Sequence, residues 1–318
     1  MRLYPPFLLL FGIIAIFISG CSDNNKIYNP PPVKTIDDAI REEILLVAIE
    51  DSQLPNIGFS LESARELIAP YDAEGIELFE YRGGYYYHPV YMGHRILNFI
   101  NSYKASGDST LLVRAEKYAE KLMTLAHIKD SVAYLPYSFR FAVHSDSTYL
   151  LEPPWFSGMA QGEFLTILCR LYRMTGKESY RQFADLIFNS FLQLRGTSAN
   201  WVARVDNDNY YWIEEYPHYY YPGQTLNGFI TAVYGVYDYA RLSERKQAKY
   251  IYQLSMTTLK HYLPQYRRAD TTSYYCLGHY HPADNAYHQL HISMLGYLYL
   301  FSNDPFFLEM QSLFEADF

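Results

Sequence analysis

The chain has 318 residues, a formal net charge of -8 and an aromatic content of 18%, which includes 34 tyrosines. This length suits one large domain or two small ones, and the acidic balance excludes a general positive field for binding nucleic acid. Of the three cysteines, Cys21 lies near the N-terminus, and the remaining Cys169 and Cys276 are too few for a disulfide framework.

The first 20 residues resemble a secretion signal of the lipoprotein type. A short basic start precedes an apolar run over residues 7–19, which is shorter than the roughly 20 residues of a membrane span but fits an h-region of about 7–15 residues. The run ends in Ile18-Ser19-Gly20-Cys21, which resembles a bacterial lipoprotein box whose cysteine is lipidated. The alternative is an ordinary signal peptide with a chance cysteine.

A polar, proline-containing stretch follows this cysteine. We therefore expect a signal peptide over residues 1–20, and a lipidated Cys21 with a flexible tether over residues 21–35. Ser22 stands where an aspartate would indicate retention in the inner membrane. The expected location is the bacterial cell envelope, where the lipid anchors the chain to the outer membrane on its periplasmic face or at the cell surface.

Helical periodicity organises the rest of the chain, residues 36–318. Four segments carry apolar residues at i, i+3, i+4 and i+7, the helical period; they are residues 96–103, 165–172, 230–237 and 292–299. A turn and a second helical segment follow each of them, and two weaker helical segments, 36–50 and 61–68, come first. Cys169 lies on an apolar helical stripe, which predicts a buried free thiol.

An aromatic insertion precedes the first helix of each repeat. These insertions contain Tyr85-Tyr86-Tyr87-His88, Pro153-Pro154-Trp155-Phe156, residues 210–221, and residues 274–288. Insertions at the same point of a repeat map to the same face of a stack, so they should meet as an aromatic cleft, the usual shape of a carbohydrate site. The predicted fold is all-α: an α/α toroid (incomplete barrel) of about four helical hairpins, with short β-hairpin insertions at one rim.

Three short motifs add a resemblance to a family. Residues 154–162 (Pro-Trp-Phe-Ser-Gly-Met-Ala-Gln-Gly), 212–217 (Trp-Ile-Glu-Glu-Tyr-Pro) and 226–229 (Leu-Asn-Gly-Phe) resemble the C-terminal catalytic domain of D-glucuronyl C5-epimerases. The resemblance runs from about residue 85 to the end, and it implies an α/α toroid. It also implies an enzyme that inverts C5 of D-glucuronate units in a heparosan- or heparan-like polysaccharide.

Inversion at C5 requires one group that removes a proton and another that returns one to the opposite face. By resemblance, Glu215 and Tyr216 match the acidic and aromatic pair of the family motif, and Tyr275 and Tyr287 match two family tyrosines. Glu215, Tyr275 and Tyr287 are therefore the proton-transfer candidates. The neighbouring Glu214 is expected to be an exposed charge or a helix-cap partner.

Substrate binding needs cations or strong donors on the uronate carboxylate, together with polar and aromatic groups for the sugar. The candidates are Trp155, Gln161, Arg140, Arg204, Trp212, Asn227, His279, His288 and His291; a structural role for His291 is an equal alternative. The sequence departs from the family at Cys276, where an acidic residue is usual, at Gly278, where an arginine is usual, and over residues 284–286, which replace Arg-Trp-Asp.

Other functions remain open. A polysaccharide lyase shares the first proton abstraction, and a glycoside hydrolase would pair Glu215 with a second carboxylate such as Glu163, Asp206 or Asp208. A surface lipoprotein that binds glycans without catalysis is a third possibility. The chemistry requires no cofactor, and the sequence shows no clear metal motif. The expected partners are a uronate-containing polysaccharide and the membrane through the lipid anchor, but no nucleic acid; a homodimer is left open.

Overall fold

A computed structural model describes residues 33–55 and 60–317. The signal peptide, the lipidated Cys21 and the tether up to residue 32 lie outside the described residues. Within the described part, no helix combines the length and the apolar character that crossing a membrane would require.

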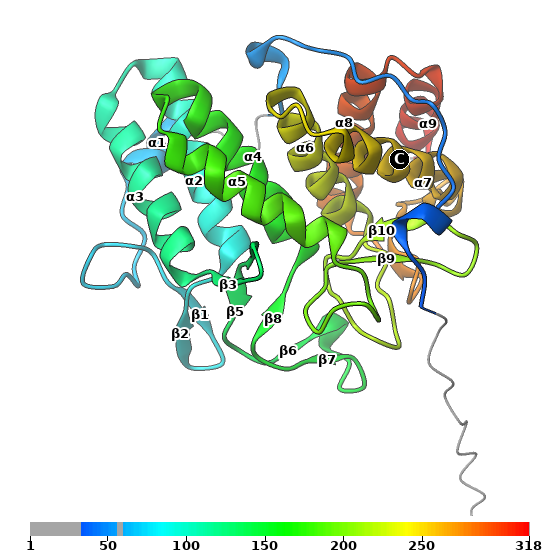
Figure 1. Cartoon of the computed structure of the whole chain (residues 1–318), viewed down its shortest axis with the longest axis horizontal. Coiled ribbons are helices and arrows are strands. Elements are labelled where there is room, and N and C mark those ends of the chain that lie inside the picture. Colours follow the sequence, from blue (N-terminus) through cyan, green and yellow to red (C-terminus); the bar gives the residue numbers. More distant parts are fainter. Residues whose placement is uncertain (1–32, 56–59, 318) are drawn as a thin grey trace, which may run out of the picture. The chain divides into compact units, whose positions relative to one another are not determined.

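Four helical hairpins make up the fold, and the predicted α/α toroid of the all-α class is confirmed (Figure 1). Each hairpin joins an inner helix to the outer helix that follows it. The pairs are α2 (Pro89–Ser106) with α3 (Ser109–Leu125), α4 (Gly158–Thr175) with α5 (Glu178–Phe188), α6 (Leu226–Leu242) with α7 (Lys246–Tyr266), and α8 (Asn285–Ser302) with α9 (Pro305–Ala316). The inner helices pack in chain order, α2 on α4, α4 on α6, and α6 on α8.

Local sequence explains where these helices end. Gly107 and Gly176 close α2 and α4 in the left-handed conformation, at φ 71° and 68°. Asn303 closes α8 at φ 53°; glycine and asparagine are the residues that adopt this conformation most readily. Asp108 and Asp304 then accept hydrogen bonds from the amides of Thr110 and Phe306, the second residues of α3 and α9. The turns predicted between the paired helices are therefore confirmed at these sites.

The two weak helical segments at the N-terminal side are shorter than predicted. Only Ile36–Asp38 forms a 3-10 helix in the first segment, and α1 covers only Leu61–Arg65 in the second. Residues 39–50 lie against α7 and the end of α8: the amide of Val47 donates to Phe301 O, and the Tyr252 hydroxyl donates to Leu45 O. The prediction of a helix over 36–50 was wrong because tertiary partners satisfy this backbone.

Short antiparallel hairpins fill the insertions, as predicted. The paired strands are β1 (Phe79–Tyr81) with β2 (Gly84–Tyr86), β3 (His127–Lys129) with β4 (Val132–Tyr134), β5 (Pro136–Tyr137) with β8 (Trp155–Phe156), β6 (Phe141–Ala142) with β7 (Leu150–Leu151), β9 (Ala203–Val205) with β10 (Tyr211–Ile213), and β11 (Tyr274–Cys276) with β12 (His281–Pro282). Strands β2, β8, β10 and β12 each lead into an inner helix, so the hairpins meet at the end where those helices begin.

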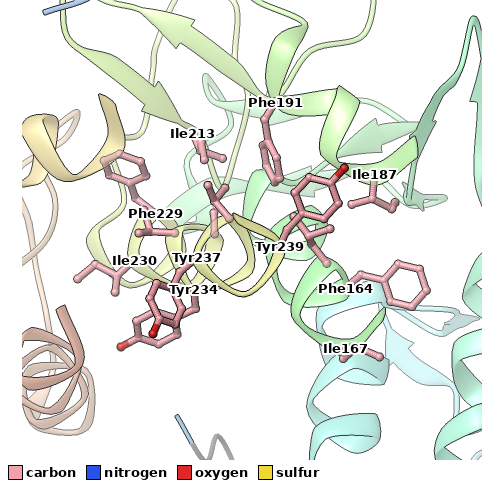
Figure 2. Close-up of a cluster of buried hydrophobic side chains, with 14 of the residues drawn as sticks. Phe164, Ile167, Ile187, Phe191, Ile213, Phe229, Ile230, Tyr234, Tyr237 and Tyr239 are labelled. Atoms are coloured by element: carbon pink, nitrogen blue, oxygen red, sulfur yellow. The ribbon is translucent and has the colours of Figure 1, made fainter. Parts of the chain in front are cut away.

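One hydrophobic core extends through all four hairpins, and Figure 2 shows the part between α4, α5 and α6, where fully buried side chains interdigitate. Phe164 of α4, Ile187 of α5 and Phe229 of α6 belong to this cluster. Helices α4 and α6 pack so closely that a Cβ added at Gly162 would lie 2.2 Å from the Cα of Ala232. Cys169 of α4 is buried and free, as predicted.

Candidate active site

Two adjoining cavities lie where the hairpins meet the inner helices. Their volumes are about 360 and 250 Å³, and Phe141, Tyr216 and Tyr287 line both, so they form one cleft. The first cavity is lined by His88, Val90, His94, Tyr137, Phe139, Trp155, Ser157, Met159, Glu215, Asn227, Thr231, Leu290 and Met294 in addition to the shared residues. The second adds Val143, His144, Tyr275, His281, Pro282, Ala283 and Asp284.

Adjacent carboxylates after β10 point in different directions, as successive residues of extended backbone do. Glu214 is turned into the protein: its Oε1 accepts from Arg204 Nε at 2.7 Å, and its Oε2 accepts from the amide of Gln224 at 2.9 Å. It is 1% exposed, so the expectation of an exposed charge was wrong. Glu215, the next residue, lines the first cavity. The anchored Glu214 thus fixes the direction of Glu215.

Glu215 is the carboxyl group whose properties suit proton transfer. It is 7% exposed, and this burial raises its pKa from 4.5 to about 7, against the lowering effect of hydrogen bonds with Tyr216 and Tyr275. Its Oε2 lies so close to α6 that a Cβ added at Gly228 would be 2.2 Å away. A carboxyl with a pKa near neutrality is populated in both protonation states, as a general acid or base should be.

Three tyrosines surround this carboxyl. The Tyr275 ring, from β11, meets the Tyr287 ring, from the first turn of α8, edge to face with centroids 4.9 Å apart. Burial raises the pKa of Tyr216 and Tyr275 well above the usual value, and the nearby Glu215 raises it further. The pKa of Tyr287 is also raised, mainly by burial and then by Glu215. All three phenols therefore carry their protons at neutral pH. The structure brings the four catalytic candidates together.

An aromatic wall faces these groups. The Trp155 and Tyr137 rings stack with centroids 3.8 Å apart, and the Phe141 ring stacks on Trp155 at 5.8 Å and on Tyr216 at 5.6 Å. Trp155 Nε1 donates to Phe139 O at 2.9 Å, which fixes the plane of the indole. Sequence reasoning identified Trp155 but missed Tyr137, Phe139 and Phe141, although their alternation over residues 137–141 indicates a strand with one aromatic face.

The two arginines proposed as carboxylate clamps lie elsewhere. Arg140 is exposed and pairs with Glu152 at 2.8 Å, outside both cavities. Arg204 is buried against Glu214, so its charge is already matched by a neighbour. Both predictions were wrong because each guanidinium is paired with a carboxylate of the protein itself. Among the described residues that line the two cavities, there is no lysine or arginine.

Several other predicted binding residues serve the core. Gln161 donates to Ala133 O and Ser190 Oγ, and accepts from the amide of Leu135. Trp212 Nε1 donates to Asp206 Oδ2 at 2.8 Å, in the core. Neither residue lines the cleft, and both assignments were wrong because buried polar groups must be satisfied locally.

The histidines of α8 and of the last hairpin that were also predicted to bind substrate lie outside the cleft. His288 and His291 are buried, and the Nδ1 atoms of both contact Ser273 Oγ, at 3.0 and 2.8 Å. The structural alternative for His291 therefore holds, and the binding role of His288 was wrong. His279 does not line the cavities but lies beside Cys276, with Nδ1 3.6 Å from Sγ. Asn227 lines the first cavity, and its binding role stays a prediction.

Backbone packing explains the glycine at the position of the family arginine. The amide of Gly278 donates to Gly223 O at 3.0 Å, and a Cβ added at Gly278 would lie 2.1 Å from Pro222 O. This backbone leaves no room for any side chain at residue 278. Sequence analysis identified the departure, and the structure gives its steric reason.

Comparisons with known proteins identify the relatives of this chain. A family model described as D-glucuronyl C5-epimerase C-terminus matches residues 129–316. An uncharacterised protein from Methanocaldococcus jannaschii is 30% identical over 174 residues, which are 54% of this chain and 54% of that protein. A D-glucuronyl C5-epimerase from Caenorhabditis elegans is 29% identical over 138 residues, which are 39% of this chain and 22% of that enzyme. The matches thus span about half, or less, of these relatives.

Two solved structures match this chain at low sequence identity. A GH76 α-mannanase from Bacteroides thetaiotaomicron has a TM-score of 0.45 at 10% identity, over 72% of this chain and 56% of that chain. An unsaturated glucuronyl hydrolase from Streptococcus agalactiae has a TM-score of 0.36 at 15% identity, over 55% of this chain and 46% of that chain.

Proposed function

Because the chain belongs to the D-glucuronyl C5-epimerase C-terminus family, we propose that it inverts C5 of D-glucuronate units in a heparosan- or heparan-like polysaccharide. One observation carries the proposal: a buried carboxyl with a pKa of about 7, Glu215, lies in a cleft with Tyr275 and Tyr287. This set contains a group that can accept a proton and phenols that can donate one.

In the proposed reaction, the ionised Glu215 removes the C5 proton, and a protonated tyrosine returns a proton to the other face. The raised pKa of Tyr287 keeps its proton in place until the carbanion forms. Tyr287 is 39% exposed, so it can regain a proton from solvent after turnover, while Glu215 releases to solvent the proton that it removed from C5. We assign Tyr287 as the donor and Tyr275 as the phenol that holds the Glu215 carboxylate in position.

The aromatic wall supports a sugar substrate. The Trp155 and Phe141 rings present apolar faces to the cleft, and Asn227 and Thr231 add polar groups. Asn227 Oδ1 and Thr231 Oγ1 are buried without a hydrogen-bond partner in the described structure, so both can bind sugar hydroxyl groups.

A deuterium-exchange experiment tests the proposal. The protein is incubated in deuterated water with heparosan, and separately with other glucuronate polymers. Deuterium at C5 together with iduronate, and without chain cleavage, is the expected result. An unsaturated uronate chromophore would identify a lyase, and binding without exchange would identify a non-catalytic glycan-binding protein.

Hydrolysis is a second candidate because a second buried carboxyl group lies behind the lining of the first cavity. Glu163 is 2% exposed, burial raises its pKa well above the usual value, and its Oε1 lies 3.4 Å from Nε2 of His94, which lines the first cavity. Both Glu163 and Glu215 raise the pKa of Tyr137, so both carboxyls approach its hydroxyl. New reducing ends without C5 exchange would favour this pair of carboxyls as a hydrolytic site.

We further propose that Cys21 is lipidated and anchors the chain in the bacterial cell envelope, at the outer membrane. Metabolic labelling with a radioactive fatty acid tests this, since the label should be lost in Cys21→Ser. A homodimer remains a separate proposal, which light scattering on the purified protein tests.

A further inference from the structure

Three potential metal ligands meet beside the cleft, although they come from distant parts of the chain. His144 Nε2 lies 3.2 Å from Cys276 Sγ, and Cys276 Sγ lies 3.6 Å from His279 Nδ1. The ligand atoms of the three residues all lie within 4.8 Å of one another. In sequence, His144 and Cys276 are 132 residues apart, so no short sequence motif predicts these three ligands.

The two sulfur–nitrogen distances match those of a tetrahedral metal centre. With a metal–sulfur bond of about 2.3 Å and a metal–nitrogen bond of about 2.0–2.1 Å, tetrahedral geometry places the sulfur and a nitrogen about 3.6 Å apart. Both measured sulfur–nitrogen distances lie within a few tenths of this value. A thiolate and two imidazoles form a ligand set that zinc prefers, and three protein ligands leave a fourth position for water or another oxygen.

The local backbone conformation positions these three side chains. His144 lies in the short 3-10 turn Val143–Ser145, with left-handed backbone angles (φ 54°, ψ 23°) that are unfavourable for a residue with a side chain. Cys276 follows a register shift in the pairing of β11 with β12, where it pairs with His281. His279 lies in the turn between these strands. Two separate hairpins thus bring their ligands to one point.

We propose that His144, Cys276 and His279 bind a divalent transition metal ion of the zinc type. On binding, the Cys276 thiol loses its proton to solvent and a metal–sulfur bond forms, while each imidazole contributes a nitrogen lone pair. No electron is transferred. The inference concerns metal binding alone, and it holds or fails independently of the proposed epimerase activity.

The protonation states of the histidines support this set. Burial and the neighbouring His281 and His279 lower the pKa of His144 to about 4, and burial lowers the pKa of His279. Both rings are therefore neutral at neutral pH, as metal ligands must be. Burial raises the pKa of Cys276, so its deprotonation requires a cation nearby, and a bound metal ion supplies one.

The location gives the site a consequence for the cleft. His144 lines the second cavity, and its ring lies 5.6 Å from the ring of Tyr275. A bound ion joins the 143–145 turn to the hairpin that carries Tyr275. It also places positive charge at the wall of a cleft whose described lining contains no lysine or arginine.

Cobalt(II) is the probe for the test, because its tetrahedral thiolate complexes absorb in the visible and near-ultraviolet ranges, whereas zinc is silent. The full-length chain is reduced, freed of metal with a chelator and titrated with cobalt, and zinc is then added in competition. We expect one ion per chain, a thiolate-to-cobalt charge-transfer band, and loss of that band on addition of zinc.

Single substitutions identify the ligands. Cys276→Ser, His144→Ala and His279→Ala should each lower zinc affinity by more than the about 10- to 100-fold that is typical for losing a supporting neighbour of a ligand. Cys276→Ser should also abolish the charge-transfer band. Cys169→Ala and His261→Ala, which remove a thiol and an imidazole elsewhere, are the matched controls and should bind normally.

Circular dichroism of each variant without metal separates loss of a ligand from loss of the fold, and His279→Ala, in a turn, is the safest of the three. Absence of a stoichiometric cobalt complex in the wild-type protein would overturn the proposal. So would a charge-transfer band that persists in Cys276→Ser, or equal affinity in all folded variants.

Discussion

The ring of Tyr275 meets the ring of Tyr287 edge to face, with centroids 4.9 Å apart, although one lies on a strand and the other on a helix. The N-cap Asp284 accepts a hydrogen bond from the amide of Tyr287 at 2.8 Å and so fixes the start of α8. This contact brings Tyr287, which lines both cavities, next to Tyr275, which lines the second cavity. The two tyrosines can therefore divide the tasks of holding the carboxylate and donating a proton.

Tyr287→Phe should remove the proposed proton donor while retaining its ring contact with Tyr275. Because general acid catalysis contributes about 10²–10⁴-fold, iduronate formation should fall by about that factor. C5 deuterium in the product, measured by NMR, checks the rate. Tyr280→Phe, at an exposed tyrosine of the neighbouring hairpin, is the control. An unchanged rate in Tyr287→Phe would show that another group donates the proton.

Glu215→Gln should change how stability depends on pH. Burial raises the pKa of Glu215 from 4.5 to about 7, so the folded state holds this proton more tightly than the unfolded state does. This group therefore makes the wild-type protein less stable as pH rises from about 4.5 to 7. The glutamine variant lacks this loss and should gain about 3 kcal/mol relative to wild type between pH 4 and pH 8. Urea unfolding at both pH values measures the difference, and a difference that does not vary with pH would contradict the assignment.

Gly228→Ala should impair activity without touching the substrate. The new Cβ would lie 2.2 Å from Glu215 Oε2, so the carboxyl must move. A misplacement of about 1 Å can cost roughly 100-fold in rate, and we expect a fall in kcat of that order with little change in KM. Gly296→Ala is the control, because its Cβ would meet only the flexible end of Gln311, at 3.1 Å. Equal activity of the two variants would refute the positioning role of the helix start.

Arg204→Met should destabilise the fold because it leaves the Glu214 carboxylate buried without its partner. Breaking a buried pair in this way costs about 3–5 kcal/mol, which urea unfolding should detect. Arg140→Met breaks the exposed pair with Glu152 and should cost at most about 1 kcal/mol. If both variants were equally stable but bound the polymer more weakly, the arginines would be substrate ligands after all.

The sequence by itself determined the repeat and the heart of the site. Helical periodicity, left-handed caps such as Gly107 and Gly176, and aspartate N-caps act within a few residues, so the four hairpins follow from local chemistry. The motif over residues 212–217 identified Glu215 and Tyr216 through its resemblance to the family. Short-range interactions decide the helices and their caps, because the residues that make them are adjacent in the chain.

Only the tertiary structure decided which polar side chains reach the cleft. Glu214 and Glu215 are neighbours in extended backbone, so their side chains point in different directions. Glu215 lines the cleft, whereas Glu214 is bonded to Arg204 in the protein interior. The ion pair with Glu214 keeps Arg204 in the protein interior and away from the cleft. Which side chains of a strand face the cleft, and where the loops run, depends on packing between distant segments. The same packing places His144 next to Cys276. Such contacts are long-range, and no local pattern in the sequence specifies them.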